Sequence, residues 1–351
     1  MRRKPHADMD AIAQAVGVSK TTVFRALHNK GRIHPETRER ILRVARELGY
    51  RPNLVARSLR LQKTSTIGLV AIGLTGWFYS HILEGVDEVA QTNEYGVLIA
   101  CSYGYPEKEI RLIQMLLDKR VDGLIVAPAD PEENRDFYEK LLAWQVPIVL
   151  IDRYIPGLPI DFVTTDNELG GYIATKHLLD LGRRRIVFVS TASRERRATS
   201  VVGRFAGYRR ALGELGIHEV VELGPGVPDT LPEEEYAFET VSHYLQQGGQ
   251  LDGAFAVNDD IAYGAIRALQ AHGLRVPEDV AVIGFDNQDT SAFVSPPLTT
   301  VAQPMREIGR QAASLLLERI HRERSVPQQR VLLAPQLVVR QSCGTHLKNR
   351  A

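Results

Sequence analysis

The sequence predicts a small all-α head with a helix-turn-helix and a hinge helix, followed by an α/β body of two doubly wound parallel sheets. In the first 50 residues, apolar side chains recur at the three- and four-residue spacing of short helices that share a core. After residue 65, apolar runs of strand length alternate with helical stretches, which is typical of buried parallel strands connected by helices. Charge changes at the same point: residues 1–64 hold 15 Lys and Arg against 5 Asp and Glu, and residues 65–351 hold 28 against 37.

The head is expected to contain two short helices and a longer one. Asp8 suits the cap of the first helix, Gly17 the turn after it, and Ser19 the cap of the second helix. Neither short helix can bury its apolar stripe alone, so a third helix, predicted from Pro35 to Leu48, closes the core, and Gly49 stops it. We therefore predict that the basic head is a folded unit with a polyanionic partner and not a solvated tail.

The second helix of such a unit enters the major groove of DNA. Its polar face carries Lys20, Thr21 and Arg25. Arginine can pair with guanine, threonine can contact bases or phosphate, and lysine can do either. The alternative for Lys20 is contact with phosphate alone.

The segment Tyr50–Arg60 follows the head. Pro52 can begin a helix here, but about eight residues are too few for a stable free helix in water. Such a segment can become ordered only when a partner holds it. It is the predicted hinge helix.

Residues 18–60, VSKTTVFRALHNKGRIHPETRERILRVARELGYRPNLVARSLR, resemble the DNA-binding head and hinge of the LacI/GalR family of bacterial transcriptional regulators. The resemblance continues over about 340 residues through KRVDGLIVAP, VPIVLID, TTDNELGGYIATKHLLDLGRRRIVFV, GLRVPEDVAVIGFDN and SPPLTTVAQP. It implies a head at residues 1–51, a hinge helix and linker at 52–65, and an effector-binding and dimerisation domain at 66–351.

The resemblance also implies which residues contact DNA. In the family, the two hinge helices of a dimer lie in the minor groove, and a leucine matching Leu59 is wedged between base steps. The predicted DNA contacts are Ser19, Lys20, Thr21, Thr22, Arg25, Asn53, Arg57, Leu59 and Arg60. The alternative for Leu59 is packing on the body. Phe24 stands where relatives usually carry a small polar residue, and Ala11 stands where an acid is common. The first departure is expected to remove a phosphate contact or to alter the base preference, but not to abolish DNA binding.

The body is expected to form a periplasmic-binding-protein-like clamshell, as the resemblance implies. The predicted strands are Ile67–Ile72, Val97–Cys101, Gly123–Pro128, Pro147–Asp152, Ile186–Ser190, Gly253–Asn258 and Val280–Asp286. Three crossings between lobes are predicted near Asp166–Gly170, Pro296–Thr300 and Pro327–Val331. The first lobe then spans about 66–166 and 298–328, and the second about 167–297 and 329–351. Helix Arg306–Arg322 returns to the first lobe, and a last strand, Val331–Val339, joins the second.

Ligands of open α/β sheets bind beyond the carboxyl ends of the strands. The predicted effector-binding residues there are Phe78, Tyr79, Asp152, Arg204, Asn258 and Asp286, with Arg204 at the start of a helix over Arg204–Leu215. Carboxylates, amides and arginine can bind adjacent hydroxyls, and aromatic rings stack on sugar faces. Residues matching Asp152, Arg204, Asn258 and Asp286 contact the ligand in sugar-responsive relatives, whereas the asparagine position differs in the purine-responsive branch.

Each of these assignments has a structural alternative. Asp152 or Asp286 could simply cap the next helix, and Asp259 or Asp260 is expected to cap a helix over Ile261–His272. The charged loop Arg194–Arg197 reads as solvated surface, although one of its arginines could reach the ligand. Asp166 and Asn167 are assigned to the lobe crossing.

Composition and motifs restrict the class of protein. No apolar stretch reaches about 18 residues and no apolar leader follows the N-terminus, so we expect a cytoplasmic chain with no membrane partner. Cys101 is expected in the core and Cys343 in a polar tail, with neither at a metal or redox spacing. No catalytic or phosphate-binding motif is present, so neither an enzyme nor a cofactor or metal site is predicted. A sugar-transport binding protein, the other rival, would lack a basic head.

The resulting hypothesis is a homodimeric transcriptional regulator, predicted to be a repressor, that binds a pseudo-palindromic operator on the bacterial nucleoid. A small ligand, predicted to be a sugar or sugar derivative, binds between the lobes and controls operator affinity. The alternatives are a nucleobase, a phosphorylated sugar or a protein co-regulator. The tail after Arg340 has no leucine heptads, so no tetramer-forming coiled coil is expected.

Overall fold

The computed structural model describes residues 8–50, 63–74, 77–191, 197–224, 231–321 and 327–348. It divides into two compact units, Met1–Thr64 and Ser65–Ala351, which are described separately. No helix among the described residues has both the length and the apolar character needed to cross a membrane.

The first unit, the head, contains the three predicted helices: α1 (Met9–Val16), α2 (Lys20–Leu27) and α3 (Pro35–Glu47). The Asp8 carboxylate accepts from the Ala11 amide at 2.9 Å, and Gly17 ends α1 with a φ of 72°. A small core holds the helices together; its buried members are Ile12, Val16, Val23, Ala26, Ile41 and Ala45. The predicted caps and the glycine turn are thus confirmed.

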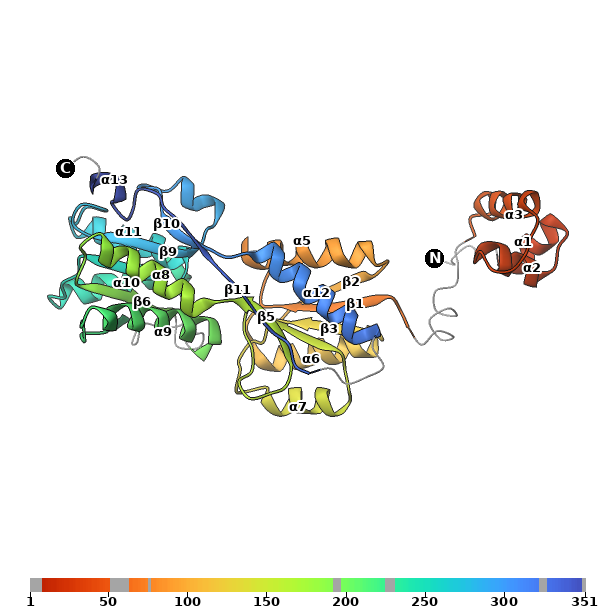
Figure 1. Ribbon diagram of the computed structural model, residues 1–351, viewed down its shortest axis with the longest axis horizontal. Helices are drawn as coiled ribbons and strands as arrows, with labels where there is room; N and C mark the ends of the chain where they lie inside the picture. Colours follow the sequence, from red (N-terminus) through yellow and green to blue (C-terminus); the bar gives the residue numbers. More distant parts are fainter. Residues whose placement is uncertain are drawn as a thin grey trace. The chain divides into compact units, whose positions relative to one another are not determined.

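The second unit, the body, contains two six-stranded sheets (Figure 1). The first sheet has the order β11-β5-β4-β3-β1-β2, and all its strands are parallel. Its strands are β1 (Thr66–Ala71), β2 (Gly96–Cys101), β3 (Gly123–Val126), β4 (Ile148–Ile151), β5 (Asp161–Thr165) and β11 (Arg330–Leu333). We call this sheet and its covering helices the first lobe.

The second sheet repeats the order, β12-β10-β9-β8-β6-β7, and forms the second lobe with its own helices. Its strands are β6 (Ile186–Val189), β7 (Val221–Leu223), β8 (Gly253–Ala256), β9 (Ala281–Asp286), β10 (Thr299–Ala302) and β12 (Gln336–Val338). Strand β12 is antiparallel to β10, so this sheet is parallel except at one edge. The predicted fold class is otherwise confirmed.

Helices cover both faces of each sheet. In Figure 1, α5 and α12 lie over one face of the first sheet, and α6 and α7 lie on the other. In the second lobe, α8 packs against α9 and α10 packs against α11. Their bounds are α5 (Trp77–Thr92), α6 (Pro106–Asp118), α7 (Arg135–Ala143), α8 (Asn167–Asp180), α9 (Thr199–Glu214), α10 (Glu233–Gln246), α11 (Asp259–Ala271) and α12 (Met305–His321). A 3-10 turn (Asp289–Ala292) and α13 (Thr345–Lys348) complete the second lobe.

The chain crosses between the lobes three times, and two crossings differ from the prediction. The first lies at Asp166, between β5 and α8, as expected. The second follows β10, because Thr299–Ala302 is a strand of the second sheet and not a connection. The third lies between β11 and β12, so the predicted single strand Val331–Val339 is wrong: its first part belongs to the first sheet.

Both cysteine predictions were wrong. Cys101 ends the edge strand β2 and is only partly buried. Cys343 is buried in the core of the second lobe, because the segment after β12 packs back on the sheet instead of forming a polar tail. The neighbouring Ser342 hydroxyl donates to the Val282 carbonyl at 2.7 Å and accepts from the Thr299 amide at 2.8 Å.

Candidate functional site

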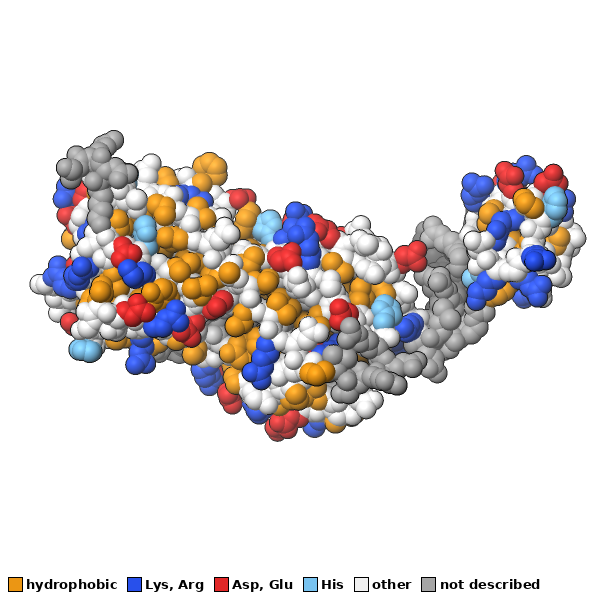
Figure 2. Space-filling view, viewed as in Figure 1, with side chains coloured by type: hydrophobic (Ala, Val, Ile, Leu, Met, Phe, Trp, Pro, Cys, Tyr) orange, Lys and Arg blue, Asp and Glu red, His pale blue; other side chains and the backbone are white. Residues whose placement is uncertain are grey.

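The head presents α2 with its polar face exposed. Ser19 caps this helix, since its hydroxyl accepts from the Thr22 amide at 3.2 Å. Thr21 and Arg25 are exposed, and Lys20 forms an ion pair with Asp10 of α1, with 2.6 Å between Nζ and Oδ2. Figure 2 shows several Lys and Arg side chains on the surface of the head. The predicted hinge contacts Asn53, Arg57, Leu59 and Arg60 lie outside the described residues.

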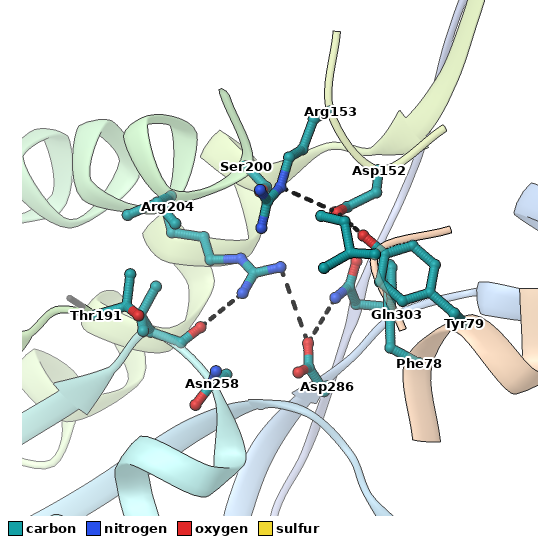
Figure 3. Close-up of a pocket in the computed structure, with 13 residues that line it drawn as sticks. Phe78, Tyr79, Asp152, Arg153, Thr191, Ser200, Arg204, Asn258, Asp286 and Gln303 are labelled. Atoms are coloured by element: carbon teal, nitrogen blue, oxygen red, sulfur yellow. Dashed lines mark hydrogen bonds and ion pairs between the residues drawn. The ribbon is translucent and has the colours of Figure 1, made fainter. Parts of the chain in front are cut away.

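A cavity of about 160 Å³ lies between the two lobes (Figure 3). All six predicted effector-binding residues line it, although they come from five separate segments of the chain. They are Phe78, Tyr79, Asp152, Arg204, Asn258 and Asp286. A cavity of this size has room for a compact polar ligand. That these residues bind the ligand remains a prediction.

The cavity lies where the topology of both sheets expects a ligand. In each lobe the order of strands reverses beside the first strand, β1 or β6, and open α/β sheets bind ligands at such points, beyond the carboxyl ends of the strands. Ile72 and Asp152 directly follow β1 and β4, Thr191 and Asn258 lie two residues after β6 and β8, and Asp286 ends β9. The facing carboxyl ends of two sheets therefore form the walls.

Asp152 joins the aromatic side of the cavity to a cation. The Tyr79 hydroxyl donates to Asp152 Oδ2 at 2.8 Å, and Arg153 Nε lies 3.4 Å from the same oxygen. Phe78 and Tyr79 meet edge to face, with 5.0 Å between ring centroids. Asp152 thus orients Tyr79 within the cavity wall, and the alternative role as a helix cap is not observed.

Arg204 is a buried guanidinium held from three sides. Its Nε donates to Asn167 Oδ1 at 2.9 Å, its Nη1 donates to the Val257 carbonyl at 2.7 Å, and Nη2 lies 3.8 Å from Asp286 Oδ1. The ring of Phe285 lies 3.8 Å beneath the guanidinium. Burial lowers the pKa of Arg204, and Asp286 opposes that effect. Because α9 begins at Thr199, Arg204 lies in the second turn and not at the predicted helix start.

Burial has a large effect on the Asp286 carboxyl. Loss of water raises its pKa to about 8, and the Arg204 charge only partly offsets that rise. Its Oδ1 accepts from Gln303 Nε2 at 2.6 Å, and Gln303 in turn accepts from the Thr165 hydroxyl at 2.6 Å. The cavity therefore contains a carboxyl group that is largely protonated near neutral pH and can donate a hydrogen bond as well as accept one.

Asn258 caps α11, which corrects the predicted role of Asp259 and Asp260. Its Oδ1 accepts from the Ile261 amide at 2.8 Å, and its Nδ2 donates to Glu233 at 2.7 Å. Asp259 instead lies buried beneath the site, where it accepts from the Ser291 hydroxyl at 2.6 Å. Burial raises the pKa of Asp259 to about 6, although three hydrogen bonds favour its ionised form.

The backbone at two strand ends adopts a conformation that side chains other than glycine rarely take. Asp152 has a φ of 63°, Asp286 a φ of 111° and Asn287 a φ of 56°. Such residues cost about 1–3 kcal/mol each and cluster at functional sites. Asp and Asn tolerate this conformation better than other side chains, and two of these residues, Asp152 and Asp286, line the cavity.

The sequence analysis missed several residues of the cavity wall. Arg153 directly follows Asp152 at the same strand end, so it could have been found. Gln303 follows β10, which was taken for a connection, and recognising that strand would have placed Gln303 at its carboxyl end. The others are Ile72, Thr191, Ser200, Val201 and Val257.

Arg197, at the end of the charged loop, bridges the lobes beside the cavity and does not line it. Its Nη2 lies 2.7 Å from Asp130 Oδ2 and 3.2 Å from Glu133 Oε1, both in the first lobe. The Tyr154 amide adds a second contact by donating to the Thr199 hydroxyl at 3.1 Å. The other arginines of this loop lie outside the described residues.

Two family models match the chain. The model for bacterial regulatory proteins of the lacI family matches residues 8–53, and the model for a periplasmic binding protein-like domain matches residues 175–343. The first covers the head and the second covers most of the second lobe with the later crossings.

The similarity to known proteins extends over nearly the whole chain. The ribose operon repressor of Haemophilus influenzae is 33% identical over 340 residues, which cover 96% of this chain and 98% of that protein. The transcriptional repressor PurR of Haemophilus influenzae (strain PittEE) has the same identity and the same coverage. Among solved structures, the lac repressor dimer bound to operator and the anti-inducer ONPF has a TM-score of 0.84 and 27% identity, covering 97% of this chain and 99% of that chain. The chain belongs to the LacI family of bacterial regulatory proteins and is a DNA-binding transcriptional regulator, as predicted, rather than an enzyme.

Proposed function

We propose that the chain is a homodimeric repressor whose affinity for a pseudo-palindromic operator is set by a monosaccharide or monosaccharide derivative bound between its lobes. The observation that carries this proposal is the single cavity lined by the six predicted residues in a chain with a basic head. A ribose operon repressor and a PurR are equally similar to the chain, so similarity does not choose the ligand. The chemistry of the cavity supports a sugar.

The cavity suits a ligand with several adjacent hydroxyl groups. Asp152 supplies an acceptor and Arg204 supplies donors. Asp286 can do either, because its carboxyl is largely protonated near neutral pH. Each sugar hydroxyl both donates and accepts, so a mixed wall of this kind can satisfy all of them. Phe78 and Tyr79 offer apolar faces on which a sugar ring can stack.

A thermal-shift screen with pentoses, hexoses, their phosphates and purine bases tests the ligand class. We expect a sugar to raise the melting temperature, because a ligand that binds only the folded state stabilises it. The Asp286→Ala variant should lose this shift and retain operator binding. Asp289→Ala, an exposed carboxylate three residues away, is the matched control and should keep both. Stabilisation by a purine base alone would contradict the sugar assignment.

For DNA, the proposal assigns Ser19, Lys20, Thr21, Thr22 and Arg25 to the major groove. The hinge residues Asn53, Arg57, Leu59 and Arg60 are assigned to the minor groove, with the paired Leu59 side chains wedged at the centre of the operator. Leu59→Ala should weaken binding to the preferred duplex far more than binding to random duplex. Equal losses on both would remove the wedge from the proposal.

Coupling follows from the three crossings between lobes. A ligand that changes the relative rotation of the lobes also changes the separation of the two hinges in a dimer. This separation in turn changes the free energy of folding the hinge helices on DNA. A coupling of about 1–3 kcal/mol would alter operator affinity roughly 5- to 150-fold. Titration of operator binding with and without the stabilising sugar measures it directly.

A further inference from the structure

Phe24 lies on the polar face of α2, among the residues assigned to DNA. Successive residues of a helix are rotated by about 100°, so Phe24 lies about 40° from Lys20 and about 60° from Thr21, with Val23 and Arg25 about 100° away on either side. Ala26, which is buried with Val23 in the core of the head, lies about 160° from Phe24. An aromatic residue therefore lies beside the hydroxyl-bearing and cationic residues of this helix.

The ring of Phe24 is partly exposed and is supported by His28, one turn further along the helix. The two rings lie against each other, with 4.3 Å between centroids and 30° between planes. The His28 Nδ1 lies 2.9 Å from the Phe24 carbonyl oxygen, a hydrogen bond that holds the imidazole beside the phenyl ring. This contact places the Phe24 ring beside His28, one turn along the same helix.

The major groove has one prominent apolar feature, the C5 methyl group of thymine, which phenylalanine can contact. Cytosine and uracil lack this methyl group. We propose that Phe24 determines part of the operator sequence by contacting a thymine methyl group in each half-site, beside the base read by Arg25. This inference rests on the proposed function, because it requires α2 to enter the major groove.

The test uses the full chain and a duplex selected from a random library with that chain, in the presence and absence of the stabilising sugar. Each thymine of the selected duplex is then replaced by uracil in both half-sites. At one position, the replacement should lower the affinity of the protein for the duplex about fourfold per half-site, which is the value expected for one buried methyl group. The same replacement should not change the affinity of Phe24→Ser for the duplex. Phe24→Leu should show part of the affinity loss seen with the wild type.

Two controls separate this role from a role in the fold. Leu42→Ser removes an exposed apolar side chain from α3 of the same unit and should keep the full discrimination between thymine and uracil. Helical circular dichroism of each variant reports whether the head is folded. If uracil can replace every thymine of the preferred duplex with the same change in affinity for the wild type and for Phe24→Ser, this inference alone is overturned. Failure to select any preferred duplex overturns the proposed function and this inference together.

Discussion

The head and the body use the same kinds of charged side chain in opposite environments. Lys20 and Asp10 of the head approach to 2.6 Å, yet their side chains are 56% and 60% exposed. Arg204 and Asp286 of the body lie 3.8 Å apart with 7% and 14% exposure. Water screens the first pair, which contributes little to stability. Burial raises the pKa of Asp286 to about 8, so this carboxyl is largely neutral near pH 7, and the buried Arg204 is held mainly by its hydrogen bonds to Asn167 and Val257. The same two types of side chain therefore form an ion pair in the head and a cation beside a largely neutral carboxyl in the body.

The largest expected effect comes from removing the buried cation. Arg204→Ala should lower the free energy of unfolding by about 3 kcal/mol or more, because it leaves the Val257 carbonyl and Asn167 without their donor and opens a void. Arg210→Ala on the same helix, which removes an exposed pair with Glu168, should cost less than about 1 kcal/mol. Urea denaturation measures both. Equal losses would show that burial does not distinguish these arginines.

A second test uses the titration of Asp286. The folded-state pKa of about 8 lies above the ordinary value of 3.8, so between these values the folded state holds a proton that the unfolded state has lost. Stability should therefore fall as pH rises through this range and level off above about pH 8. We expect the wild type to lose about 2 kcal/mol more than Asp286→Asn between pH 6 and 8. Parallel pH profiles of the two proteins in urea denaturation would contradict this assignment.

In the head, Lys20→Ala distinguishes base contact from phosphate contact. If Lys20 reads a base, affinity for the preferred duplex should fall about tenfold with a smaller loss on random duplex. If it contacts phosphate only, both affinities should fall alike and the salt dependence should decrease by about one released counterion. Fluorescence anisotropy at several salt concentrations measures this. Unchanged affinity for both duplexes would remove Lys20 from the interface.

The smallest effect is expected at the bridge between the lobes. Arg197→Ala should raise the dissociation constant of the stabilising sugar by no more than about threefold at low salt, because the guanidinium is exposed and its buried partner Asp130 keeps the Glu132 and Glu133 amides as donors. The difference from wild type should vanish near 0.5 M salt, where exposed charges are screened. Calorimetric titration at the two salt concentrations checks this. A tenfold effect that persists at high salt would mean that this bridge behaves like the buried pair.

The sequence predicted the head nearly completely, since caps, glycine turn and apolar spacing are all local features. In the body it predicted β1, β2, β3, β4, β6, β8 and β9 and the six residues that meet at the cavity, but it did not predict β5 or β7. It failed where a strand is short and polar: Thr299–Ala302 was taken for a crossing, and Gln303 was lost with it. The unusual backbone at Asp152 and Asp286 and the raised pKa of Asp286 depend on packing between distant segments, so no local pattern could reveal them.

The three passages of the chain between the lobes have a consequence for dissection of this protein. Each lobe is assembled from pieces on both sides of the other, and β12, at the edge of the second sheet, comes from the last 16 residues of the chain. No single proteolytic cut can therefore release an intact lobe. A truncation before Gln336 removes β12, the edge strand of the second sheet, although most of that sheet lies much earlier in the sequence. Fragment expression of either lobe would need a circularly permuted or spliced gene.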